Sequence, residues 1–160
     1  MRLLLLGLGL VLLGLSPHPR AAIEQNPLVD SWRMVSYQRV LDNGVPENGL
    51  GEHPKGVVIL TPEGRAVLLT TADGRKAAVN DADRAALWKS MVAYSGKYRI
   101  EGNDFITSVD VSWNEEWNGT EQRRHFKIEG DKLILTTSPA PSPIYPGKTY
   151  YARVVFEREK

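Results

Sequence analysis

The sequence predicts an all-β protein, an eight-stranded antiparallel up-and-down β-barrel with one inserted α-helix. Residues 94–139 contain four strand-like segments in which apolar and polar residues alternate. Turn sequences separate these segments at residues 101–104, 118–119 and 129–131. A meander of this length leaves exposed edge strands unless the sheet closes on itself. These observations favour a closed barrel over an open sheet.

The N-terminus predicts export. Arg2 precedes an unbroken run of apolar and glycine residues over 3–15. This run is shorter than the ~20 residues that a membrane-spanning helix needs, and Pro17 and Pro19 end any helix behind it. We therefore expect residues 1–22 to be a signal peptide, residues 23–160 to form one barrel domain, and the protein to be secreted or periplasmic, with no membrane span after processing. An uncleaved membrane anchor is the alternative.

Composition narrows the classes of site. There are no cysteines, so disulfides and thiolate metal sites are excluded, and the three histidines are scattered, which does not favour a transition-metal site. Removal of residues 1–22 takes away Arg2 and Arg20, which leaves 18 basic residues of the original 20 against 19 acidic ones, a net charge of about −1. This balance does not favour nucleic acid as a partner. We expect no cofactor, and the oligomeric state is not predicted.

The predicted elements follow in chain order. The first strand covers residues 31–40, and a hairpin follows around the turn Pro62-Glu63-Gly64. The helix is expected over 81–93, capped by Asn80 or Asp81 and stopped by Gly96, with its apolar side packed on an open end of the barrel. The remaining strands are expected at 56–61, 65–71, 97–101, 104–113, 120–128, 132–137 and 148–157.

Several local patterns, found in order along the chain, resemble the lipocalin-like domain family of small calycin-type barrels. The matching residues are Ser31-Trp32-Arg33, Pro54-Lys55-Gly56, Tyr94-x-Gly96-x-Tyr98, Trp117-x-Gly119-Thr120 and Gly130-Asp131-x-Leu133-x-Leu135. The resemblance implies a barrel with a central cavity and no transferable catalytic residues. In lipocalin barrels an arginine near the last strand stacks on the tryptophan of the first strand, which implies that Arg158 and Trp32 close one end. Asp30 stands where lipocalins usually have glycine.

Alternation along the strands predicts which side chains face the barrel interior. A ligand-binding set with aromatic walls and a few polar groups is expected at Gln38, Tyr98, Phe105, Trp113, Gln122, Arg124 and Tyr150. Arg124 stands out because an arginine on an inner face needs a partner. That partner is either a ligand carboxylate or an internal acid such as Glu116 or Glu121.

Three functions remain open at this point. The first is non-catalytic binding of a small apolar or amphipathic molecule inside the barrel. The second is a cofactor-free isomerase or cyclase, with Tyr98 or Tyr150 as acid and Arg124 stabilising an oxyanion. The third is a packed structural or interaction module, which predicts no internal pocket.

Overall fold

The computed structural model describes residues 26–42, 44–142 and 146–160, so the predicted signal peptide over 1–22 lies outside the described residues. The helices are α1 (Asp81–Lys89) and the single 3-10 turn η1 (Glu115–Trp117). The strands are β1 (Asp30–Leu41), β2 (Pro46–Asn48), β3 (Lys55–Leu60), β4 (Arg65–Thr71), β5 (Met91–Glu101), β6 (Asp104–Ser112), β7 (Glu121–Glu129), β8 (Lys132–Thr137), β9 (Ala140–Pro141) and β10 (Thr149–Arg158). Within the described residues, no helix combines the length and apolar character that a membrane crossing requires.

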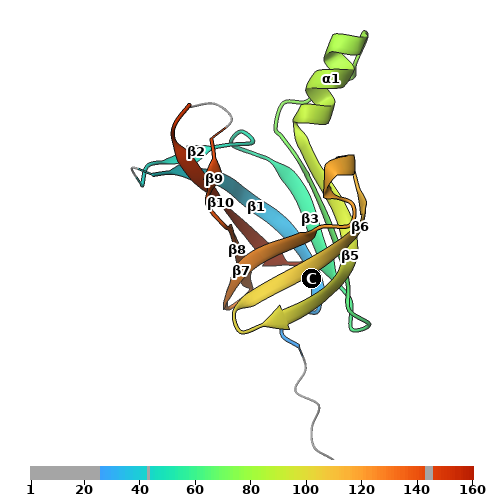
Figure 1. Ribbon diagram of the computed structural model, residues 1–160, viewed down its shortest axis with the longest axis vertical. Coiled ribbons are helices and arrows are strands. Elements are labelled where there is room, and N and C mark those ends of the chain that lie inside the picture. Colours follow the sequence, from blue (N-terminus) through green and yellow to red (C-terminus); the bar gives the residue numbers. More distant parts are fainter. Residues whose placement is uncertain (1–25, 43, 143–145) are drawn as a thin grey trace, which may run out of the picture.

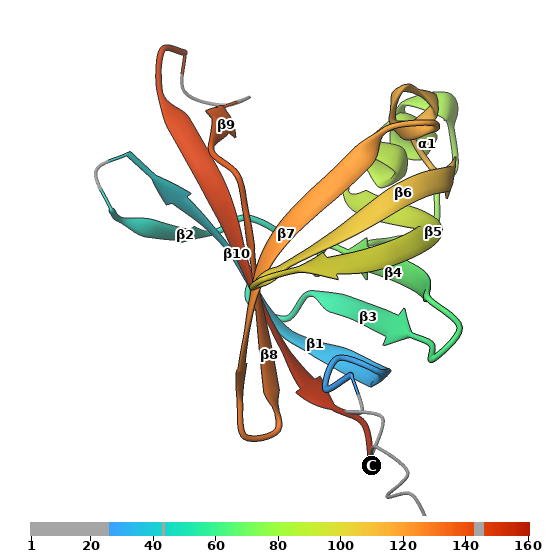
Figure 2. The same cartoon turned by 60° about the horizontal axis from the view of Figure 1, so that its bottom comes forward.

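Eight of the strands form a closed antiparallel barrel, as the sequence predicts (Figures 1 and 2). Each strand pairs with the next in the order β1-β3-β4-β5-β6-β7-β8-β10, and β10 then pairs with β1 to close the ring. The short strands β2 and β9 extend the ladders of β1 and β10 beyond the barrel at one end. Closure leaves no free edge in the ring, which protects such a sheet from edge-to-edge association.

One end of the barrel is closed by a cluster of side chains around Trp32. At this end Trp32, fully buried, pairs with Arg158 across β1 and β10, and the Arg158 guanidinium lies 4.2 Å from the centre of the indole ring. Arg158 also forms an ion pair with Asp30. The pKa of Asp30 is lowered mainly by the hydrogen bond from the Ser31 backbone N–H, and also by the hydrogen bond from Arg158. Leu28 is fully buried beside Trp32 and accepts the indole N–H through its carbonyl at 2.9 Å. This end is closed by side chains.

Two β-bulges change which residues face inward. On β1 the register shifts between Met34 and Ser36, so that Val35 is an extra residue and points out, 42% exposed. Tyr37 consequently pairs with inward-facing Val154. Gln38, which was expected to face the interior, therefore lies on the outer face, because one inserted residue moves every later side chain to the other face.

The second bulge lies where β5 meets β6. Ser95 pairs with Val111 and Gly96 with Val109, which leaves Asp110 as the extra residue. Val111, which unbroken alternation from Phe105 along β6 would place inside the barrel, is 61% exposed. Asp110 points outward as well, and its carboxylate accepts hydrogen bonds from both terminal nitrogens of Arg65, at 2.5 and 2.9 Å.

The helix differs from its predicted position and length. It begins as expected, with the Asn80 side chain accepting the Asp83 N–H at 2.9 Å, but it ends at Lys89 and gives way to β5 at Met91. None of its residues is buried, and Figure 1 shows it projecting beyond the barrel and not packed across the opening. The expectation that the helix covers the open end is therefore wrong, and that end remains accessible.

Candidate functional site

A cavity of about 550 Å³ occupies the barrel interior toward the end opposite Trp32. The β1–β10 ladder shows at which end the cavity lies. Trp32 pairs with Arg158 at the closed end, and Leu41 pairs with Tyr150, a cavity-lining residue, at the other end. The innermost wall is apolar. The lining includes Leu68, Val92, Leu135, Ala152, Val154 and Phe156, the aromatic residues Tyr37, Tyr94, Trp113, Trp117 and Tyr150, and the polar residues Thr70, Gln122, Arg124, Thr137 and Ser138.

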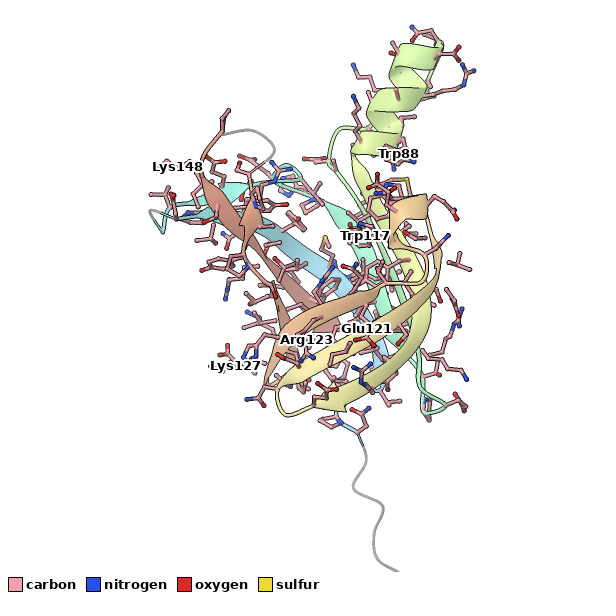
Figure 3. The ribbon with its side chains drawn as sticks, in the orientation of Figure 1. Trp88, Trp117, Glu121, Arg123, Lys127 and Lys148 are labelled. Atoms are coloured by element: carbon pink, nitrogen blue, oxygen red, sulfur yellow. The ribbon has the colours of Figure 1, made fainter. Side chains whose placement is uncertain are left out.

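Tryptophans form one side of the cavity mouth. Trp113 and Trp117 both line the cavity and meet edge to face, with ring centres 4.8 Å apart. Trp88, from the end of α1, lies 6.0 Å from Trp113 and donates its indole N–H to the Trp113 carbonyl at 3.2 Å. Figure 3 shows Trp88 at the base of the helix, above Trp117 at the rim of the barrel. These contacts join the three indole rings into one aromatic surface at the rim of the barrel.

Arg124 projects into this cavity from β7. Its Nη1 donates to the Arg123 carbonyl at 2.9 Å, its Nη2 donates to Gln122 Oε1 at 3.2 Å, and its guanidinium lies 5.8 Å from the centre of the Tyr94 ring. Among the described residues it forms no ion pair with a carboxylate. The internal acids expected as partners are engaged elsewhere, because Glu121 pairs with Arg99 and Glu116 accepts from Asn114.

The other charged residues at the cavity wall belong to an ion-pair network on the outer surface of β5, β6 and β7. Glu121 accepts from Arg99, and Arg123 donates to Glu101 and Asp104 at 2.9 and 2.8 Å. These hydrogen bonds lower the pKa of Glu121 and raise that of Arg123, so both remain charged. Figure 3 shows the neighbouring positions of Glu121 and Arg123. Their charges are compensated, and that of Arg124 is not.

Two residues of the cavity wall carry a buried hydroxyl group that has no partner among the described residues. Thr70 is 3% exposed and Tyr94 is 4% exposed, and neither the Thr70 Oγ1 nor the Tyr94 hydroxyl forms a hydrogen bond with any residue that the structure describes. A buried polar atom that lacks a partner destabilises the folded state by about 1–3 kcal/mol relative to a satisfied one. Both oxygens are shielded from the cavity by surrounding atoms, so each remains an unsatisfied polar group inside the wall.

This arrangement makes a prediction about stability. Thr70→Val and Tyr94→Phe each remove an unpartnered hydroxyl with little change in shape, so we expect each to raise the free energy of unfolding of the ligand-free protein by on the order of 1 kcal/mol. Urea denaturation followed by circular dichroism measures the change.

The matched control for these variants is Thr137→Val. Thr137 also lines the cavity, but its hydroxyl accepts the Ala152 N–H at 2.9 Å. The same substitution should therefore lower stability by about 1 kcal/mol. A similar loss for Thr70→Val and Thr137→Val would show that the Thr70 hydroxyl has a partner in solution.

Tyrosine hydroxyls provide further donors near Arg124. Tyr37 on β1 and Tyr150 on β10 both line the cavity. Burial raises the pKa of the Tyr37 phenol, and the nearby Tyr150 raises it further, so Tyr37 stays protonated at neutral pH. A protonated phenol can donate a hydrogen bond to an acceptor in the cavity.

The structure brings together four of the residues expected to bind a ligand and separates the other three. Trp113, Gln122, Arg124 and Tyr150 line the cavity. Of the others, Gln38 does not face the interior, because the bulge at Val35 turns it to the outer face, where it accepts from Arg153 at 3.5 Å.

Tyr98 and Phe105 lie below the cavity, in the closed part of the barrel. Tyr98 donates its hydroxyl to the Thr61 carbonyl at 3.1 Å and accepts from Asn26 at 2.9 Å, and its ring meets Phe105 edge to face. Phe105 is 1% exposed and belongs to the packed core. Tyr98 does not line the cavity and its hydroxyl is engaged by Thr61 and Asn26, so its role as an acid beside Arg124 in the isomerase hypothesis is not supported by this placement.

Sequence reasoning missed Tyr37, Thr70, Tyr94 and Trp117 as lining residues. The pattern of β1 contains a signal for Tyr37, since the apolar positions Trp32 and Met34 are followed by an aromatic residue at 37 and not at 36 or 38. That break in the alternation marks the bulge. No simple pattern indicates Thr70.

No group of three or more His, Asp or Glu side chains that could hold a metal ion occurs in the described part of the chain. Comparison with known protein families shows that residues 29–158 match the model of the lipocalin-like domain. Among curated proteins, no sequence matches the chain.

Proposed function

Because the chain belongs to the lipocalin-like domain family, we propose that it binds a small apolar or amphipathic molecule inside its barrel, without catalysis. The observation that carries this proposal is the cavity of about 550 Å³, which lies within the range of about 300–1,000 Å³ typical of small-molecule sites. A fully packed module would have no such space, so the cavity argues against the third hypothesis.

The chemistry of the wall supports the same proposal. Leu68, Leu135, Val154 and Phe156 provide an apolar inner surface, and the tryptophans at the mouth are large flat contact surfaces. Transfer of apolar area from water to such a wall is favourable by roughly 25 cal/mol per Å². The few polar groups fix the orientation of a ligand that carries an oxygen or nitrogen atom.

Export is part of this proposal. The apolar run over residues 3–15 supports secretion or periplasmic location, with residues 1–22 removed. Intact-mass measurement of the protein purified from its own cells tests this, because processing removes a defined N-terminal mass. Native mass spectrometry of the same material reveals a small molecule that co-purifies.

Filling the cavity should weaken binding strongly. Ala152 is 2% exposed and lines the cavity, so Ala152→Phe places a ring in the void. We expect the affinity for the neutral ligand 1-decanol, measured by tryptophan fluorescence of the cavity wall, to fall at least about tenfold, which corresponds to about 1.4 kcal/mol.

Val67→Phe is the control for this experiment. It adds the same ring to β4 at a position that is 36% exposed on the outer surface, and binding should be unchanged. Thermal melting confirms that both variants fold, and Ala152→Leu repeats the test with a smaller side chain. Equal affinity of all three variants and the wild type would show that the ligand binds outside the barrel.

A further inference from the structure

The charges of the cavity wall are unbalanced. Three charged residues line the cavity, and Glu121 and Arg123 are paired with groups on the outer surface. Arg124 has no carboxylate partner among the described residues, and its two intramolecular hydrogen bonds go to uncharged oxygens. A guanidinium has five N–H donors, so several remain for a bound group. The cavity therefore has one uncompensated positive charge.

The surroundings of Arg124 are rich in hydrogen-bond donors. Tyr37 and Tyr150 line the same cavity and both carry a phenol hydroxyl. The Arg124 guanidinium carbon lies 5.8 Å from the centre of the Tyr94 ring, which holds the cation at the cavity wall. Donors gathered around one cation, with no anion among them, form a site for an acceptor that carries negative charge.

The charge and shape of the site distinguish between anions. A phosphate monoester carries a charge of about −1.5 to −2 at neutral pH, which exceeds what the single guanidinium of Arg124 can balance. A carboxylate carries one charge, and its two oxygens match the planar fork of an arginine. The apolar wall formed by Leu68, Leu135 and Val154 then suits the rest of the molecule.

We propose that the ligand is an organic monocarboxylate whose carboxylate is bound by Arg124, with Tyr37 and Tyr150 beside it and its apolar part against the inner wall. This inference rests on the proposed function, and it adds the class of ligand and its orientation. Arg124 is the residue that determines specificity, since it distinguishes an anionic head group from a neutral or cationic one.

Isothermal titration with three ligands that share one chain tests the inference. Decanoate, 1-decanol and decylammonium differ only in head group, and each is titrated at neutral pH into the wild type and into Arg124→Gln. We expect the wild type to bind decanoate on the order of 10- to 100-fold more tightly than 1-decanol, because hydrogen bonds to charged groups are strong. Decylammonium should bind most weakly. Arg124→Gln should bind decanoate and 1-decanol with similar affinities.

Two further variants serve as controls. Lys127→Gln removes a positive charge from the same strand, but Lys127 is exposed on the outer face and pairs with Glu129, so the preference for decanoate should persist. Arg124→Lys keeps the charge without the fork and should keep part of the preference. Thermal melting shows that each variant is folded before it is titrated.

The outcomes separate this inference from the proposed function. Equal binding of decanoate and 1-decanol by the wild type overturns the carboxylate site and leaves the proposed function intact. An undiminished preference for decanoate in Arg124→Gln also overturns it, because the head group must then lie elsewhere. Failure of all three ligands to bind the wild type overturns the proposed function as well.

Discussion

Replacing Trp32 with alanine is expected to lower the free energy of unfolding by about 3–5 kcal/mol, the usual range for a fully buried tryptophan. The indole is fully buried, donates to the Leu28 carbonyl at 2.9 Å and lies under the Arg158 guanidinium. Alanine would open the closed end of the barrel to water. Because a domain is stable by only about 5–15 kcal/mol, much of the total would be lost. Denaturant titration followed by circular dichroism measures it.

Trp88→Ala is the matched control, since it is the same substitution at the opposite end of the barrel. Trp88 is 47% exposed on a helix that has no buried residue, so we expect a loss below about 1 kcal/mol. Trp32→Phe keeps an aromatic ring under Arg158 and loses only the indole N–H and some volume, so its effect should be intermediate. Equal losses for Trp32→Ala and Trp88→Ala would contradict the role assigned to Trp32 at the closed end.

The strands of the barrel were predictable because their signals are local. Alternation and the glycine turns place the eight barrel strands near their observed positions, except that β5 begins at Met91 and not at residue 97, and the short strands β2 and β9 were not predicted. Gly64, Gly102 and Gly130 each adopt a positive φ at a hairpin turn, a conformation in which glycine is favoured. The match of residues 29–158 to the lipocalin-like domain confirms the family that the ordered motifs indicate. Fold class and strand order can thus be predicted from patterns within short segments of the sequence.

The helix end was not predictable in this way, because it depends on contacts between distant segments. Met91 continues a helical spacing of apolar residues after Leu87 and Trp88, and the same residues also suit a strand. Pairing decides between the two, since Met91 lies opposite Thr71 on β4 and Thr70 opposite Val92. Tertiary hydrogen bonding along β4 therefore overrides the local helical preference.

The candidate site was predicted only in part, and for a physical reason. Strand alternation assigns faces correctly until a bulge inserts one residue. Gln122, Arg124 and Tyr150 lie on strands where the assignment holds, whereas Trp113 reaches the cavity from beyond the end of β6, after the bulge at Asp110. Gln38 lies beyond the bulge at Val35, so Tyr37 takes its place. Glu121 on β7 pairs with Arg99 on β5, which leaves Arg124 without an acidic partner among the described residues. This pairing between distant strands cannot be predicted from local sequence patterns.

Introducing a methyl group at Gly96 should lower the free energy of unfolding by about 3 kcal/mol or more, because overpacking costs about 1–3 kcal/mol even where side chains can move. Gly96 lies at the β5–β6 bulge, where an added Cβ would be 2.0 Å from the Ser108 carbonyl oxygen and 2.7 Å from its carbon. These are backbone atoms, so the two strands must separate. This contact explains why the pattern Tyr94-x-Gly96-x-Tyr98 requires glycine at its centre.

Gly102→Ala is the comparison that isolates the contact from the general effect of replacing glycine. Gly102 lies in the turn that joins the same two strands, with φ +60° and nothing within 4 Å of an added Cβ. Gly102→Ala should therefore lower the free energy of unfolding only through the left-handed backbone conformation, by about 1–2 kcal/mol. Denaturant titration of both variants measures the difference, and the loss for Gly96→Ala should be clearly the greater. If the two losses are equal, β5 and β6 do not approach each other at Ser108 as closely as the structure shows.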